Sequence, residues 1–419
     1  MSTETPAQTE AAVNERQGQA RVRTILLVVG IVLLALNLRA CITAVGPLVG
    51  EIRAGTGLSN TLIGLMTALP LLAFAAFSPL APRLGRRWGM ELILLVSLLV
   101  LTAGIALRSV PLVSMLFLGT ALLGAAIALG NVLLPALIKR DFPAHIGLMT
   151  GLYSMLIGAG GALADGVSIP LAQGAGLGWR GSLFFWTLPA ALTALLWLPL
   201  LRFRSRTTVS QARISAPRGL WRSPLAWQVT LFMGLQSLTF YIAIAWFPVI
   251  LQNEGLSATS AGWMLSLVQF VGVAGSFLTP LLAARMRGQH SLVSVSILLG
   301  LLSYVGILSD TPHLILLWCI CLGLAQGAYL SLALMFFILR TPDTRAASEL
   351  SGMAQSIGYL LAAFGPLLFG WLHDLTQAWT IPLLALMLIT LALFAVGMGA
   401  GRDVVVELQT TEANGISGE

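Results

Sequence analysis

The chain has 419 residues, of which 57% are hydrophobic and only 9% are charged, and its mean hydropathy is +0.90. Soluble domains are about one quarter charged, so this composition excludes an ordinary soluble protein. A helix needs roughly 20 apolar residues to cross a bilayer. Runs of that length follow one another along almost the whole chain, which predicts an all-α membrane protein with many spans.

Twelve membrane-spanning helices are predicted from the apolar runs between clusters of Gly, Pro and Arg. The first six cover residues 24–50, 59–82, 90–108, 111–138, 146–172 and 179–201. The second six cover residues 227–251, 258–284, 291–309, 312–339, 346–371 and 378–400. The predicted organisation is a disordered tail (1–20), a six-helix bundle (21–201), a basic linker (202–226), a second six-helix bundle (227–400) and a C-terminal tail (401–419).

The distribution of basic residues predicts the orientation of these spans. With the N-terminus inside the cell, nineteen of the 23 Lys and Arg residues fall on the cytoplasmic side and three on the opposite side. The remaining one, Arg39, lies within the membrane. The positive-inside rule predicts such an asymmetry. If the number of spans were wrong by one helix, the basic residues would no longer gather on one side. Both termini are therefore expected in the cytoplasm.

The two halves repeat a pattern about 200 residues apart. "KRDFPAHIGLMTGLYS" (139–154) and "LRTPDTRAASELSGMAQS" (339–356) each contain a basic helix end, a proline turn and a small-residue pair in the next helix. Two parallel six-helix repeats are typical of a transporter whose site lies between the halves, near the middle of the membrane.

Twelve spans in two repeats resemble the major facilitator superfamily. The stretch "SPLAPRLGRRWG" (78–89) is similar to the signature of that superfamily after the second span, which acts as a gating loop. The residues that match it are Arg83, Gly85, Arg86 and Arg87. Ser78 and Pro82 replace the usual glycine and acid, so the resemblance does not extend to the charge relay of that loop.

A closer resemblance covers nearly the whole chain. "IALGNVLLPALIKRDFP" (127–143), "WRSPLAWQVTLF" (221–232) and "LSGMAQSIGYLLAAFGPLL" (350–368) are similar to the cyanate and 2-nitroimidazole transport family (CynX/NimT-like). This resemblance implies a monomeric carrier in the bacterial cytoplasmic (inner) membrane. It leaves the substrate open, because that family includes carriers of a pseudohalide anion and of a neutral heteroaromatic compound.

Arg39 is the charged residue that most needs an explanation. At 1.5 Å per residue it lies roughly 22 Å from the cytoplasmic start of the first span and about 16 Å from its outer end. An arginine facing lipid at that depth costs about 3 kcal/mol or more, so we expect Arg39 to face a central cavity. A guanidinium group matches planar pairs of oxygen atoms, which predicts contact with an anion or a nitro group. The alternative is a structural ion pair with an internal acid.

Other polar and aromatic residues are predicted at a similar depth. With Arg39 they form the predicted substrate site: Asn37, Thr43, Asn131, Tyr153, Gln236, Tyr241, Gln269, Gln326, Tyr329, Gln355 and Tyr359. Amide donors and aromatic rings around one arginine suit a small, planar, polar solute. The alternative is that many of these amides only bond neighbouring helices.

Two acids are predicted within helices near this site, and either could carry a coupling proton. Asp165 lies in the fifth span and Glu349 near the start of the eleventh. Asp165 could instead face water or form a local hydrogen bond. Glu349 could instead stabilise the positive end of its helix dipole.

The leading hypothesis is a secondary transporter that moves a small planar polar or anionic solute, such as 2-nitroimidazole or cyanate, by alternating access. The alternatives are a drug efflux transporter of broader specificity and a non-transporting receptor or channel. No enzyme is expected, because no paired carboxylates, histidine cluster or serine with its base is found at a common depth. No G-x-x-x-x-G-K-[ST] sequence occurs, so ATP is not expected to drive transport directly. The Cys and His spacing predicts no metal or other cofactor. The expected partners are the solute, membrane lipids and possible coupling protons, and no nucleic acid.

Overall fold

The computed structural model describes residues 6–203, 219–309 and 312–406, and these residues are almost entirely helical. The helices of the first half are α1 (Pro6–Thr43), α2 (Val49–Thr56), α3 (Asn60–Phe77), α4 (Leu80–Trp88), α5 (Met90–Arg108), α6 (Val113–Asp141), α7 (Ile146–Ile169), α8 (Gly178–Phe185) and α9 (Thr187–Trp197). Those of the second half are α10 (Pro224–Asn253), α11 (Ala258–Ala283), α12 (His290–Leu308), α13 (Ile315–Leu339), α14 (Thr344–Thr376) and α15 (Thr380–Ala400).

Within the described residues, eleven helical segments are long and apolar enough to cross a membrane. The segments Leu62–Phe77 and Leu80–Trp88 meet at an angle of 56° and form a twelfth span if they are counted together. The bend falls at Pro79, which has no backbone N–H to continue the helical bonding. These findings confirm an all-helical protein of up to twelve spans. The gating-loop residues, however, lie on helix α4 rather than in a loop.

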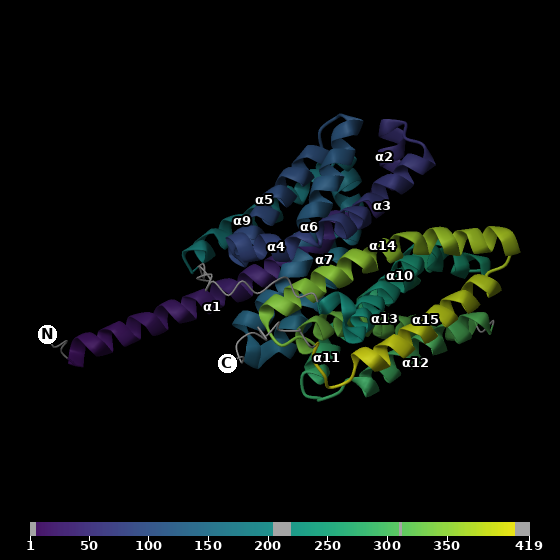
Figure 1. Ribbon diagram of the computed structural model, residues 1–419. Helices are drawn as coiled ribbons and strands as arrows, with labels where there is room; N and C mark the ends of the chain where they lie inside the picture. The colour runs from purple at the N-terminus through teal and green to yellow at the C-terminus, as the bar shows by residue number, and fades with distance from the viewer. Residues whose placement is uncertain (1–5, 204–218, 310–311, 407–419) are drawn as a thin grey trace, which may run out of the picture.

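The helices form two bundles that correspond to the two halves of the chain (Figure 1). In the first bundle α5 packs on α6 and α9, α3 on α6, and α1 on α7. In the second bundle α10 packs on α14 and α15, and α11 packs on α13. The halves meet where α7 packs on α11 and where α14 packs on α3, α4 and α6. Any site between the halves is therefore lined by these helices and their neighbours.

Glycines allow α7 and α11 to approach closely. A Cβ atom added at Gly147 would lie 2.6 Å from Ala284 Cβ and 2.7 Å from the Pro280 carbonyl oxygen. One added at Gly151 would lie 2.9 Å from the Phe277 carbonyl oxygen. These separations are shorter than ordinary van der Waals contacts, which are about 3.5–4.0 Å between carbon atoms. Larger side chains at these positions would therefore push the two halves apart.

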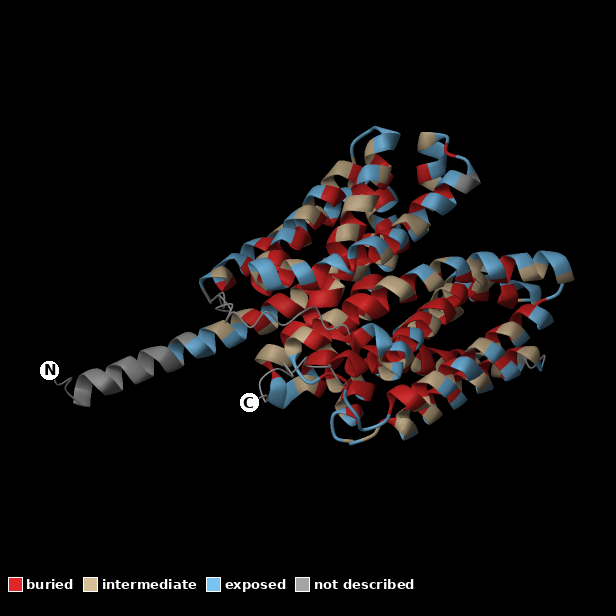
Figure 2. Ribbon diagram, in the orientation of Figure 1, coloured by how far each residue is buried: buried red, intermediate tan, exposed pale blue. Residues whose placement is uncertain are grey.

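Buried residues gather at the centre of the molecule, where the bundles meet, and exposed residues lie toward its outside (Figure 2). Many of the exposed side chains are large and apolar. Phe270, Leu367 and Leu388 are 74%, 70% and 67% exposed. A surface of this kind is suited to contact with lipid.

The N-terminal part of the chain differs from the sequence prediction. Residues 6–20 were expected to be disordered, but they continue α1 as helix up to Thr43. This stretch contains Ala, Glu, Gln and Arg, which favour helix, and the membrane span supplies the nucleus from which the helix can extend. Residues 1–5, most of the predicted linker (204–218) and most of the C-terminal tail (407–419) lie outside the described residues.

Candidate functional site

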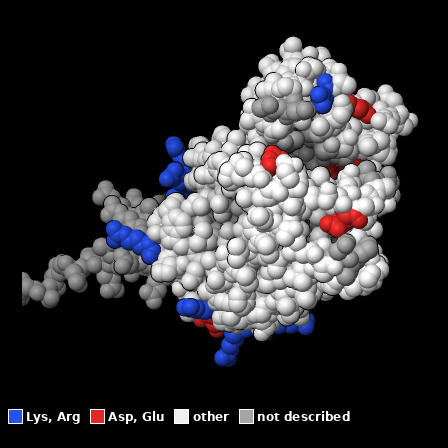
Figure 3. All heavy atoms as spheres, turned by 90° about the vertical axis from the view of Figure 1, so that its right-hand side faces the viewer, with Lys and Arg blue, Asp and Glu red and all other residues white. Residues whose placement is uncertain are grey.

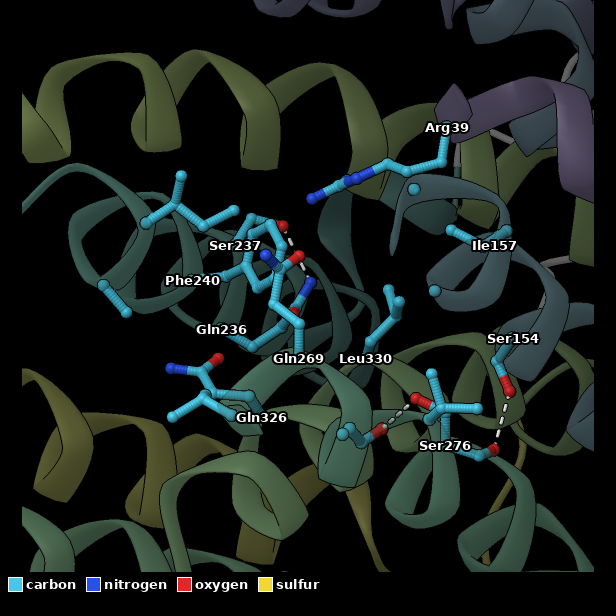
Figure 4. A pocket seen from close by; sticks show the side chains of 18 of the residues that line it. Arg39, Ser154, Ile157, Gln236, Ser237, Phe240, Gln269, Ser276, Gln326 and Leu330 are labelled. Carbon is cyan, nitrogen blue, oxygen red and sulfur yellow. Dashed lines mark hydrogen bonds between the residues drawn. The ribbon is translucent and has the colours of Figure 1, made fainter. Parts of the chain in front are cut away.

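Arg39 projects from α1 toward the second half of the molecule (Figure 4). Its Cζ atom lies 4.4 Å from the centre of the Phe240 ring and 5.6 Å from that of the Tyr241 ring, both on α10. Gly161 of α7 leaves room for the arginine side chain, since a Cβ atom there would lie 2.9 Å from Arg39 Cγ. The close packing of α1 on α7 thus directs the guanidinium group into the space between the halves.

Among the described residues, no carboxylate lies within salt-bridge distance of Arg39, although Asp165 is near enough for its charge to interact with that of the arginine. The ion pairs formed within the described parts of the chain all involve other arginines. The guanidinium group is balanced instead by the electron-rich faces of Phe240 and Tyr241. Because an aromatic face does not use the N–H donors in the plane of the group, these donors are available to a ligand.

A cavity of about 80 Å³ lies beside Arg39, between the two halves. This central cavity is lined by α1, α7, α10, α11, α13 and α14. Six of the predicted site residues line it: Arg39, Gln236, Tyr241, Gln269, Gln326 and Tyr359. By the measure of about 10–15 Å³ per water molecule, it has space for about six waters or a small organic solute.

The amides in the central cavity differ in how they are bonded. Gln236 Nε2 donates to Ser237 Oγ at 2.7 Å. Neither polar side-chain atom of Gln326 forms a hydrogen bond within the described residues, although the Tyr304 hydroxyl is near and Gln326 is only 7% exposed. A buried polar group without a partner costs about 1–3 kcal/mol. Gln326 can therefore gain stabilising hydrogen bonds from a bound solute.

A second cavity, the small chamber, has a volume of about 30 Å³ and lies on the other side of Arg39. Its polar lining consists of Arg39, Asn131, Tyr153, Gln355 and Tyr359. Gln355 Nε2 donates to the Asn131 carbonyl oxygen at 2.9 Å, and the Tyr153 hydroxyl lies 3.3 Å from Asn131 Oδ1. Since Gln355 belongs to the second half and Asn131 to the first, the chamber spans the boundary between the halves.

Three predicted site residues line neither cavity. Asn37 Nδ2 donates to Thr193 Oγ1 at 3.1 Å, and Thr43 Oγ1 donates to the Gly161 carbonyl oxygen at 3.0 Å. The Tyr329 hydroxyl donates to the Ser296 carbonyl oxygen at 3.1 Å. Each of these residues bonds within its own half. Their hydrogen bonds join neighbouring helices, which is the alternative role that the sequence left open.

The structure adds residues that sequence reasoning missed. Phe240 follows Gln236 by four positions, so both lie on one face of α10, and this spacing could have revealed it. The central cavity also has a serine cluster in its wall. Ser154 Oγ of α7 donates to the Ser276 carbonyl oxygen of α11 at 2.7 Å, and Ser331 Oγ of α13 donates to the same oxygen at 2.9 Å. This cluster links the two halves directly.

The predicted proton-coupling acids occupy different environments. Asp165 of α7 is partly buried near Thr43 and Gln269, and its charge interacts with that of Arg39. Glu349 lies at the start of α14, where Arg86 Nη1 contacts its Oε1 atom at 2.5 Å and Arg345 Nε contacts the same atom at 3.2 Å. Asp165 is thus beside the central cavity, whereas Glu349 joins α4 to α14.

The molecule has one end at which the halves are held together by polar contacts. Lys139 Nζ, at the end of α6, donates to the Ile338 carbonyl oxygen at 2.7 Å, to Thr341 Oγ1 at 2.9 Å and to the Thr341 carbonyl oxygen. A cation near the last carbonyls of α13 is favourable for the helix dipole. We call the region around Lys139, the Arg86–Glu349 pair and Gly147 the closed end.

The remaining residues of the gating motif support the closed end to different degrees. Gly85 is buried, and a Cβ atom there would lie 3.0 Å from Leu133 Cδ2. Arg87 lies over the Trp88 ring at 5.1 Å, and Arg83 is exposed. Pro82, which replaces the usual acid, packs beside Gly352 of α14, where an added Cβ atom would lie 3.0 Å from Pro82 Cγ. This contact is steric rather than ionic.

The family model described as Major Facilitator Superfamily matches residues 27–366. This chain belongs to the major facilitator superfamily. The proton:xylose symporter XylE has a similar structure, with a TM-score of 0.70 and 15% identity over 92% of this chain and 98% of that one. That likeness supports the fold.

Three relatives are similar along most of the chain. The "Uncharacterized transporter YycB" of Bacillus subtilis is 45% identical over 91% of this chain and 95% of its own length. The "2-nitroimidazole transporter" of Escherichia coli is 44% identical over 90% of this chain and 96% of its own. The "Cyanate transport protein CynX" of Escherichia coli is 28% identical over 83% and 89%. The predicted family is confirmed, and the chain is a multi-pass secondary transporter of small solutes rather than an enzyme.

Proposed function

We propose that the protein carries a small planar polar or anionic solute, such as 2-nitroimidazole or cyanate, across the bacterial inner membrane as a monomer. The observation that carries this proposal is the unpaired guanidinium group of Arg39, which lies over Phe240 beside the central cavity. The names of the relatives in Escherichia coli support the same substrate class.

The geometry around Arg39 suits such a solute. Two stacked planar groups lie about 3.5–4.0 Å apart, so a ring cannot enter between the guanidinium group and Phe240 at their present separation of 4.4 Å. We propose that the solute binds at the edge of the guanidinium group. Its nitro or anionic oxygens accept the arginine N–H bonds, and its flat face contacts Phe240 or Tyr241.

We propose that the closed end faces the cytoplasm, so that the central cavity is reached from outside the cell. Arg86, Lys139 and Arg345 lie at the closed end, and the positive-inside rule expects such basic residues on the cytoplasmic side. The opposite face has a recess between two lobes with acidic side chains around it, and most of the Lys and Arg visible in this view lie at the outline of the molecule, away from the recess (Figure 3). Both termini then lie in the cytoplasm, as the sequence predicts.

Asp165 is our proposed site for a coupling proton. It lies beside the central cavity and interacts with Arg39, so its charge changes the attraction of that arginine for an anion. A protonated Asp165 leaves the positive charge of Arg39 uncompensated, whereas an ionised Asp165 partly neutralises it. Glu349 is already engaged by two arginines and is a weaker choice.

The test compares wild type with Arg39→Gln in proteoliposomes. We expect the substitution to weaken binding of 2-nitroimidazole or cyanate roughly 10- to 150-fold, because hydrogen bonds to a charged group contribute about 1.5–3 kcal/mol. Arg180→Gln is the matched control: Arg180 also lies over an aromatic ring, that of Trp179 at 4.3 Å, but does not line either cavity.

Counterflow of labelled solute into preloaded vesicles distinguishes the possible functions. Exchange by wild type and by Arg180→Gln, but not by Arg39→Gln, supports the proposal. Equal exchange by Arg39→Gln contradicts the role of this arginine. Flux without counterflow would indicate a channel, binding without flux a receptor, and exchange of bulky cations alone a drug exporter.

A further inference from the structure

The polar residues predicted to form one ring are divided between two spaces. Gln236, Gln269 and Gln326 line only the central cavity, whereas Asn131, Tyr153 and Gln355 line only the small chamber. Arg39 and Tyr359 line both. The guanidinium group therefore stands between two separate sets of hydrogen-bonding side chains.

The two spaces share an apolar part of their walls, which we call the Ile157–Leu330 constriction. Besides Arg39 and Tyr359, the shared lining consists of Ile157 of α7 and Leu330 of α13. These two side chains come from opposite halves, and both lie beside Arg39 in the lining of the central cavity (Figure 4). A change in the relative position of the halves would widen or narrow this passage.

The small chamber is too small for the solute in the state that the structure shows. At about 30 Å³ it has space for about two water molecules, compared with about six in the central cavity. It is nevertheless polar and incompletely bonded. Gln355 is 1% exposed, and its Oε1 atom has no hydrogen-bond partner among the described residues.

Opening of the closed end would enlarge this chamber and release its donors. The Gln355 Nε2 bond to the Asn131 carbonyl oxygen joins α14 to α6 and must break when these helices separate. The amide then has one N–H donor for a ligand, since the other is bonded to Ser351 Oγ on the same helix. The buried Gln355 carbonyl and the two tyrosine hydroxyls add further hydrogen-bonding groups around Arg39.

We propose that the small chamber is a second binding station for the same planar polar or anionic solute, occupied when the closed end opens. This inference rests on the proposed function. The solute passes the Ile157–Leu330 constriction while Arg39 keeps its charge-assisted contact. Only the neutral partners are exchanged: the glutamines of the central cavity are replaced by Asn131, Tyr153 and Gln355.

The test measures the KM of solute exchange separately from each face of the membrane, with 2-nitroimidazole and cyanate as probes. Intact cells report the outer face, and inverted membrane vesicles report the inner face. The matched variants are Gln326→Met in the central cavity and Gln355→Met in the small chamber. Ser356→Ala is the control, because it removes another bond between the halves, from Ser356 Oγ to the Ala75 carbonyl oxygen at 2.6 Å, and lines neither space.

We expect Gln326→Met to raise the KM at the outer face about 3- to 10-fold, and Gln355→Met to raise it by a similar factor at the inner face only. If Gln355 acted only by holding the closed end shut, its substitution would lower the inner KM and raise the outer one, as Ser356→Ala should. That result, or an equal change at both faces, would overturn the second station. Exchange of neither probe by wild type would instead refute the proposed function.

Discussion

The glycines between α7 and α11 allow a direct test of whether the closed end controls access to the cavities. A methyl group at Gly151 would lie 2.9 Å from the Phe277 carbonyl oxygen, about 0.5 Å closer than an ordinary contact. Overpacking of this kind costs about 1–3 kcal/mol. Because the cost applies only while the helices touch, Gly151→Ala should favour opening of the closed end about 5- to 150-fold.

The assay is the rate at which a maleimide reacts with Ser348→Cys in protein without its native cysteines. Ser348 is 7% exposed at the start of α14, one turn before Gly352, which packs on α4. Opening of the closed end should expose this position. Gly151→Ala should therefore increase labelling of Ser348→Cys. It should also weaken solute binding from the outer face, because fewer molecules would present the central cavity to the outside.

Gly166→Ala is the control for this prediction, since a Cβ atom at Gly166 would meet nothing within 4 Å. It lies on the same helix and makes the same chemical change without contact with α11. If labelling rises no more in Gly151→Ala than in Gly166→Ala, the packing of α7 on α11 does not hold the closed end shut. Thermal unfolding of both variants would show whether a change in labelling reflects loss of the fold.

Three further predictions concern charged residues. Lys139→Met should destabilise the closed conformation by about 1–3 kcal/mol, because buried acceptors at the end of α13 lose their donor. It should therefore increase maleimide labelling of Ser348→Cys. Arg83→Met is the control, since Arg83 is exposed, and it should leave this labelling unchanged. Arg86→Met and Glu349→Gln should each increase labelling of Ser348→Cys no more than about fivefold, because an ion pair in which the Arg86 side chain is 40% exposed contributes little stability. Added salt should reduce the difference in labelling between these variants and wild type. Asp165→Asn should keep counterflow but lose accumulation driven by an imposed pH gradient; unchanged accumulation would exclude Asp165 as the proton site.

The membrane spans were predictable because each requires a long apolar run whatever its neighbours are. The central position of Arg39 was predictable for a related reason, since its distance from both ends of the first span follows from helical rise alone. Depth in the membrane is thus largely a property of one helix. The sequence also showed the two halves through their repeated segments (139–154 and 339–356), which the structure places at the closed end.

The direction in which each side chain points was less predictable, because it depends on how helices pack together. Tyr329 and Asn37 have the depth of a site residue, but both bond within their own half. The spacing of Phe240 from Gln236 could have placed it on the cavity face of α10, but its contact with Arg39 follows only from how the helices pack. The helix at residues 6–20 was missed for another reason: its composition is polar, and its helical state follows from continuity with the span that comes after it.

The pairing of Arg39 with Phe240 also has a consequence for how the chain enters the membrane. The two residues are about 200 positions apart, so the arginine emerges from the ribosome about 10–40 s before its aromatic partner, at 5–20 residues per second. During that interval Arg39 lacks its aromatic partners on α10, and exposure of its charge to lipid costs about 3 kcal/mol or more. We therefore expect the nascent first bundle to remain beside the insertion machinery, or to keep water around Arg39, until α10 arrives. The first half produced alone should be prone to degradation, and production of the second half as a separate chain should rescue it.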